Sequence, residues 1–111
     1  MATIKSYSDL QQSKKLAEIL PLESADMYWW YSGRRYYIEA MNDGDFNEKE
    51  GHVRAWSLAA LLDVLPNYEI NNFGDSIQLD VKNKALVTDE GETLLDLVVN
   101  MIIYLHELNL L

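Results

Sequence analysis

Aromatic side chains gather in one short segment of this chain, and they are the residues whose types and spacing indicate a working surface. Six of the twelve aromatic residues lie within ten consecutive positions. Aromatic rings bury large areas and offer polar tips, so a dense group serves either as core or as a recognition platform. The six are Tyr28, Trp29, Trp30, Tyr31, Tyr36 and Tyr37, interrupted by Ser32-Gly33 and by Arg34 and Arg35. This segment is the candidate contact site.

Motifs for covalent or phosphate chemistry are not visible. The sequence has no glycine-rich phosphate loop, no G-x-S-x-G elbow and no cysteine. His52 and His106 are its two histidines; they are far apart and in no metal-ligand spacing, so we interpret both as structural residues. We therefore expect no catalytic residues, no cofactor and a non-enzymatic protein.

One acidic stretch resembles the start of a calcium loop, because Asp43, Asp45 and Asn47 alternate as the first oxygen ligands do. Glu48 then replaces the glycine at position six, and Arg54 replaces the glutamate at position twelve. We read the stretch as a solvated surface loop and predict no metal site. An alternative is a small enzyme with its site where this acidic loop meets the aromatic segment, which requires a deep pocket and a carboxylate with a shifted pKa.

Charge and composition restrict the partners and the compartment. The net charge of -9 repels phosphate backbones, so nucleic acid is a disfavoured partner, although an acidic mimic of nucleic acid stays an alternative. The N-terminal residues lack the apolar core of a signal peptide, and the apolar stretch at 94–105 is too short to span a bilayer. Together with the absence of cysteine, this predicts a cytoplasmic protein with no membrane contact.

The aromatic segment reads as a β-hairpin over residues 27–39, since Gly33 accommodates the positive φ of a tight turn. A two-residue Ser32-Gly33 loop would pair Tyr31 with Arg34. Alternation then separates two faces. The apolar face is expected to be core and contains Met27, Trp29, Tyr31, Arg34, Tyr36 and Ile38. The other face, with Glu39, is expected to be the wet contact surface, and its binding residues are Tyr28, Trp30, Arg35 and Tyr37.

Helices and further strands are expected on both sides of the hairpin. A capping box at Ser8 begins a helix that ends near residue 20, and Ser57 begins a short helix that Pro66 ends. Residues 68–81 alternate around a Gly74-Asp75 turn, and residues 85–88 add a strand. Thr93 begins a largely apolar last helix over residues 94–109.

This order predicts one α+β domain over residues 1–111, arranged α-ββ-α-βββ-α, with a mostly antiparallel sheet made of two hairpin units. The last helix has few polar positions, so we expect it to lie across the sheet. Its remaining apolar surface suggests a homodimer through this helix.

Several blocks resemble a family of small uncharacterised proteins from gut anaerobes, found among phage-like and mobile-element genes. The blocks are QSKKLAE at 12–18, PLESADM at 21–27, AWSLAALLDVLP at 55–66 and ETLLD at 92–96. The resemblance implies an accessory role in a mobile element. A second likeness, carried by Gly91-Glu92-Thr93-Leu94, is to HicB-type antitoxins and implies an antitoxin-like regulator as an alternative. Our hypothesis from the sequence is a binding protein that contacts a protein partner through the aromatic hairpin.

Overall fold

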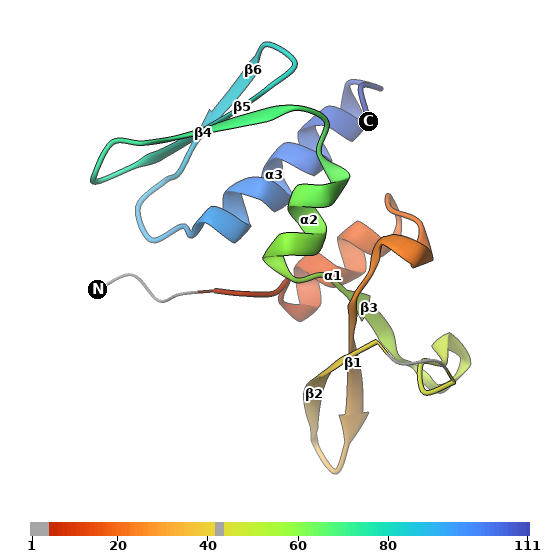
Figure 1. The fold of residues 1–111 in the computed structure, drawn as a ribbon. Helices are drawn as coiled ribbons and strands as arrows, with labels where there is room; N and C mark the ends of the chain where they lie inside the picture. Colours follow the sequence, from red (N-terminus) through yellow and green to blue (C-terminus); the bar gives the residue numbers. More distant parts are fainter. Residues whose placement is uncertain (1–4, 42–43) are drawn as a thin grey trace.

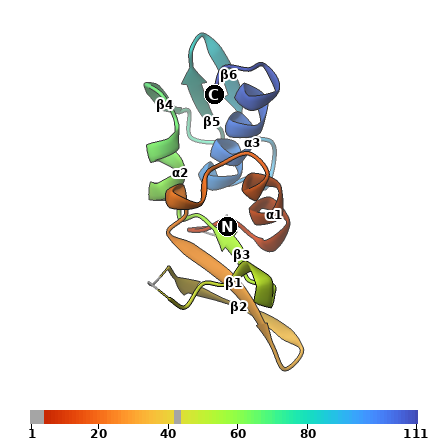
Figure 2. The same ribbon diagram turned by 90° about the vertical axis from the view of Figure 1, so that its right-hand side faces the viewer.

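The computed structural model describes residues 5–41 and 44–111 and contains two three-stranded antiparallel sheets with three α-helices between them (Figure 1). Viewed from the side, one sheet lies above the helices and the other extends below them (Figure 2). The α+β class and the predicted order α-ββ-α-βββ-α are confirmed, with one additional short strand between the first hairpin and the second helix. The strands divide over two sheets, where one mostly antiparallel sheet was expected.

Helix α3 (Leu94–Glu107) lies at the centre of the core, with the second sheet on one side and α1 and α2 against it. Its predicted capping box is present, because the Thr93 side chain accepts from the backbone of Asp96, and the Asp96 carboxylate accepts from the Thr93 N–H. Seven of its side chains are buried, as expected for a helix laid across a sheet. The fully buried residues of the core include Leu16, Trp56, Leu61, Leu79, Leu95, Val98, Met101, Ile102 and Leu105.

The second sheet has the order β4-β5-β6, with β4 (Tyr68–Asn72), β5 (Ile77–Val81) and β6 (Lys84–Val87). Ile70 pairs with Leu79 and Tyr68 with Val81, so the predicted apolar face is confirmed. On this face Leu79 and Val81 of β5 are buried, since α3 contacts β5 and β6, whereas Tyr68 and Ile70 of β4 are exposed.

The first two α-helices are short and capped by side chains. Helix α1 (Leu10–Ala17) begins one residue later than expected, because Asp9 rather than Ser8 forms the capping box with Gln12. Ser8 is instead fully buried, and its hydroxyl bonds Ser13 and accepts the N–H of Trp56. Helix α2 (Leu58–Val64) begins at the predicted Ser57 cap.

The first sheet has the order β2-β1-β3, with β1 (Met27–Ser32), β2 (Arg35–Ala40) and β3 (Val53–Ala55). Strand β3 was not expected, and it pairs with the first half of β1. Two 3-10 helices, η1 (Leu22–Ser24) and η2 (Glu48–Glu50), lie in the connections. Within the described part of the chain, no helix has the length and apolar run needed to cross a bilayer.

Candidate functional site

Residues 27–40, called the arm below, project away from the rest of the molecule (Figures 1 and 2). The Cα radius of gyration is 14.6 Å, whereas a compact domain of similar size has roughly 13 Å. None of the side chains of β1 and β2 belongs to the hydrophobic core cluster or packs directly against it. The arm is therefore aromatic without being core.

The turn of the arm lies one residue later than predicted. Tyr31 pairs with Tyr36 and Ser32 with Arg35, so the two loop residues are Gly33 and Arg34. Gly33 has a φ of +73° at the first loop position, which suits a type II′ hairpin turn. The predicted pairing of Tyr31 with Arg34 is wrong, because Tyr31 pairs with Tyr36, two residues farther along the chain. A shift of two residues leaves every side chain on its predicted face of the hairpin.

Tyr28 was predicted to belong to the wet contact face, and that expectation is wrong. Its side chain is only 4% exposed. The acidic loop covers it: the Phe46 ring lies 5.8 Å from the Tyr28 ring, and the His52 ring stacks on it at 5.2 Å. The Tyr28 hydroxyl donates to Glu39 at 3.0 Å. Burial raises the pKa of this phenol, and the bond to Glu39 adds to the increase.

The other three predicted binding residues lie together farther along the arm. The rings of Trp30 and Tyr37 stack at a centroid distance of 4.8 Å and an interplanar angle of 25°. The guanidinium carbon of Arg35 lies 4.8 Å from the Tyr37 ring centroid, and Arg35 Nε donates to the Tyr37 hydroxyl at 2.9 Å. Trp30 and Tyr37 are half-buried and Arg35 is exposed. We call these three residues the Trp30 stack.

The opposite face of the arm was expected to be core, and that prediction is wrong. Tyr31 is 59% exposed and Tyr36 is 39% exposed, although their rings pair at 5.1 Å. Nearer the body, Trp29 packs edge-on against Tyr7 at 5.8 Å, and its indole N–H donates to the Ser8 carbonyl at 3.1 Å. The arm is thus anchored at its base and exposed on both faces near its tip.

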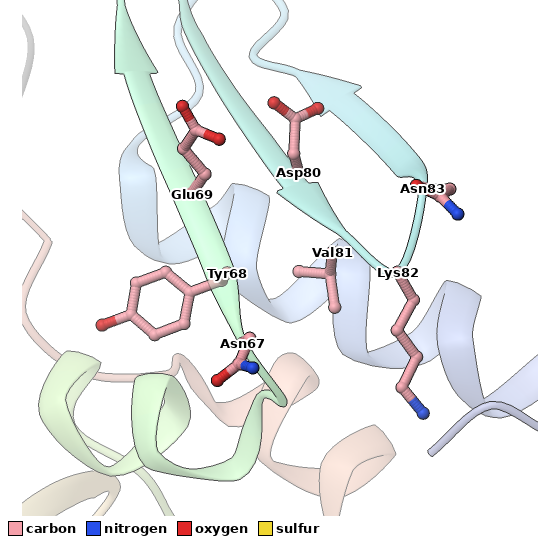
Figure 3. A pocket seen from close by; sticks show the side chains of 7 residues that line it. All are labelled: Asn67, Tyr68, Glu69, Asp80, Val81, Lys82 and Asn83. Atoms are coloured by element: carbon pink, nitrogen blue, oxygen red, sulfur yellow. The ribbon is translucent and has the colours of Figure 1, made fainter.

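Three pockets of the described surface are lined by residues outside 44–51, the described part of the acidic loop beside which the enzyme alternative places its site. One is a hollow of about 500 Å³ at the end of β4 and β5, in which Glu69 and Asp80 lie side by side on neighbouring strands (Figure 3). Another, of about 380 Å³, lies beside Trp29, Lys5 and Asp96. The calcium-like pattern extends from Asp43 to Arg54, and Asp43, its first position, lies outside the described residues.

An ion-pair network beside Trp29 joins the N-terminal segment to α1 and α3. Lys5 Nζ lies 2.7 Å from Asp96 and 2.9 Å from Asp9, and Gln12 donates to Asp96 at 2.9 Å. Burial alone would raise the pKa of Asp96, but the bonds from Lys5, Thr93 and Gln12 outweigh it and lower that pKa to about 2. The bonds to both carboxylates likewise outweigh burial and raise the pKa of Lys5. Three groups of the chain itself therefore satisfy the Asp96 carboxylate.

Sequence reasoning missed this network and the contacts that hold the arm. Lys5 and Asp96 are 91 positions apart, so no local spacing could indicate the pair. Phe46 is the one aromatic residue of the acidic loop, and this is the only feature of the sequence that could have indicated that the loop packs against the arm. Comparison of the chain with protein-family models, curated proteins and solved structures finds no match.

Proposed function

We propose that this protein is a non-enzymatic interaction protein that binds a protein partner through the arm. The observation that supports this is the position of the aromatic side chains: they lie outside the core cluster, on a hairpin that extends from the body. A two-stranded ribbon is marginally stable alone. The paired rings stabilise the arm locally but add nothing to the core cluster. Tyrosine, tryptophan and arginine are the residue types enriched in binding hot spots.

The Trp30 stack is the part of the arm best suited to contact. The Trp30 and Tyr37 rings are already stacked, so their side chains lose little conformational entropy when a partner binds. Arg35 is held through its Nε, which leaves its terminal Nη groups for a carboxylate or a carbonyl of the partner. Tyr31 and Tyr36 extend the contact to the other face of the arm.

A protein fits this surface better than nucleic acid does. Arg34 and Arg35 are the two cations of the arm, whereas the whole chain has a charge of -9. Binding of single strands requires a positive groove along the backbone as well as stacking. We further propose a cytoplasmic accessory role in a phage or mobile element, and this part of the proposal depends on the resemblance of the sequence blocks.

The test is capture of a partner from the native host by the tagged protein. The double variant Trp30→Ala/Tyr37→Ala should reduce recovery of the partner at least about tenfold, because hot-spot residues of this kind each contribute about 2 kcal/mol or more. Tyr68→Ala is the matched control, since Tyr68 is a 43% exposed tyrosine on the other sheet. Equal recovery with the double variant and the control would refute the proposal. Denaturant unfolding should show that both variants are folded.

A further inference from the structure

Within residues 5–41 and 44–111, strand β2 is paired on one side only. It is the end strand of the order β2-β1-β3, and the hairpin is closed by the pair Ser32 and Arg35. In an antiparallel hairpin with this closing pair, alternate residues direct their N–H and C=O groups away from the neighbouring strand, and on β2 these include Tyr36 and Ile38. Among the residues that the structure describes, no backbone hydrogen bond reaches these outward groups.

This edge also carries two charges of opposite sign in a symmetric arrangement. Arg35 and Glu39 lie on the same face of β2, two residues to either side of Tyr37. They are about 13 Å apart along the strand, too far to pair with each other. Neither forms an ion pair within the described chain. Of the four strands at sheet edges, β2 is the one with both an acidic and a basic residue.

We propose that β2 pairs with β2 of a second copy of this chain, antiparallel and centred on Tyr37. Arg35 of each copy then lies opposite Glu39 of the other, Tyr36 lies opposite Ile38, and the two Tyr37 side chains face each other across the two-fold axis. Tyr36 and Ile38 exchange the outward backbone hydrogen bonds. The interface is isologous, and it joins the two three-stranded sheets into one of six strands.

The charges select this register over its neighbours. A slip of two residues in either direction keeps the backbone bonds but places Arg35 opposite Tyr37 or places Tyr37 opposite Glu39, so both ion pairs are lost. Both charged groups are already held, because Arg35 Nε bonds the Tyr37 hydroxyl and Glu39 accepts from Tyr28. Each has further hydrogen-bonding capacity for the second copy.

The projection of the arm makes this pairing compatible with the negative charge of the molecule. Residues 27–38 contain no carboxylate, so Glu39 is the one acidic residue of the paired segment, and in the dimer it lies opposite Arg35. The two bodies lie at opposite ends of the joined sheet, and separation beyond about 8 Å screens their repulsion at physiological salt. The pairing goes beyond the proposed partner binding because it uses the backbone edge of β2, although both contacts use the Arg35 side chain.

The first experiment is a charge exchange followed by sedimentation velocity over a concentration series. Wild-type protein should dimerise, Arg35→Glu and Glu39→Arg should each weaken the dimer at least about tenfold, and the double exchange in one chain should restore it. Wild-type protein that stays monomeric up to about 1 mM would overturn the proposal. So would a dimer that both single variants leave unchanged, which would instead indicate the exposed surface of α3.

The second experiment uses the absence of cysteine from this chain. Residues opposite each other in a non-hydrogen-bonded antiparallel pair have Cα atoms about 4.5 Å apart, within the range that a disulfide requires. Tyr37→Cys should therefore form a covalent dimer under mild oxidation. Tyr31→Cys is the control, because Tyr31 is exposed but lies on β1, away from the axis. Equal cross-linking at the two positions would contradict the proposed register, even if a charge variant fails to fold.

Discussion

Each of the two sheets of this molecule has three antiparallel strands, yet one packs against the central helix and the arm of the other does not. On β5 the alternating residues Leu79 and Val81 are buried against α3. On the arm the equivalent alternation leaves Tyr31 and Tyr36 exposed. The difference is a covering helix. Strand alternation determines which side chains share a face, whereas burial depends on what packs against that face.

Residue type follows this difference. The covered sheet uses aliphatic side chains, which gain stability from removal of apolar surface from water. The arm uses rings that pair across the strands, at 4.8 Å for Trp30 and Tyr37 and 5.1 Å for Tyr31 and Tyr36. Cross-strand aromatic pairs stabilise a ribbon that has no core of its own. The arm therefore obtains local order while its surface stays available.

The largest expected effect is at the covered sheet. Leu79→Ala removes a fully buried side chain, so the free energy of unfolding should fall by about 2–5 kcal/mol through lost burial and the cavity left behind. Denaturant unfolding measures this change. A loss below about 1 kcal/mol would mean that this sheet contributes no more to the stability of the core than the arm does.

An intermediate effect is expected at the network beside the base of the arm. The folded-state pKa of Asp96 is lowered to about 2 from 3.8. Its contribution is therefore complete above pH 4 and is lost as the pH falls from about 4 to 2, and we expect a loss of about 1–2 kcal/mol after solvent screening. Unfolding of wild-type and Asp96→Asn proteins from pH 2 to 6 checks this. Identical pH dependence in the two proteins would contradict the role of this carboxylate.

The smallest effect is expected at the tip of the arm. Tyr31→Ser removes an exposed ring and its pair with Tyr36, so the free energy of unfolding should change by no more than about 0.5 kcal/mol. The same denaturant measurement applies, with Leu79→Ala as the reference for a core residue. A loss comparable to that of Leu79→Ala would show that the arm folds as part of the core.

Local patterns predicted the elements of this fold well. Thr93 and Ser57 cap the helices where the sequence indicates, and residues 68–81 form the predicted hairpin. The errors concern long-range relations. Tyr28 is buried because Phe46 of the acidic loop packs against it. Strand β3 forms because residues 53–55 pair with the edge of β1 that β2 does not occupy. The spacing of residues along the chain indicates neither of these two contacts. The candidate site was predicted in part, since Trp30, Tyr37 and Arg35 do lie together.

Ser8 connects the two regions through different atoms of one residue. Its carbonyl holds the indole of Trp29, while its hydroxyl bonds Ser13 and the backbone of Trp56. A displacement of the arm that moves Trp29 therefore acts on Ser8, and through Ser8 on the residues beside the helices. Hydrogen exchange of the Trp29 indole proton and of the Trp56 amide proton would therefore report separately on the two sides of Ser8. Similar protection of both protons would indicate that the hairpin is rigidly attached to the body.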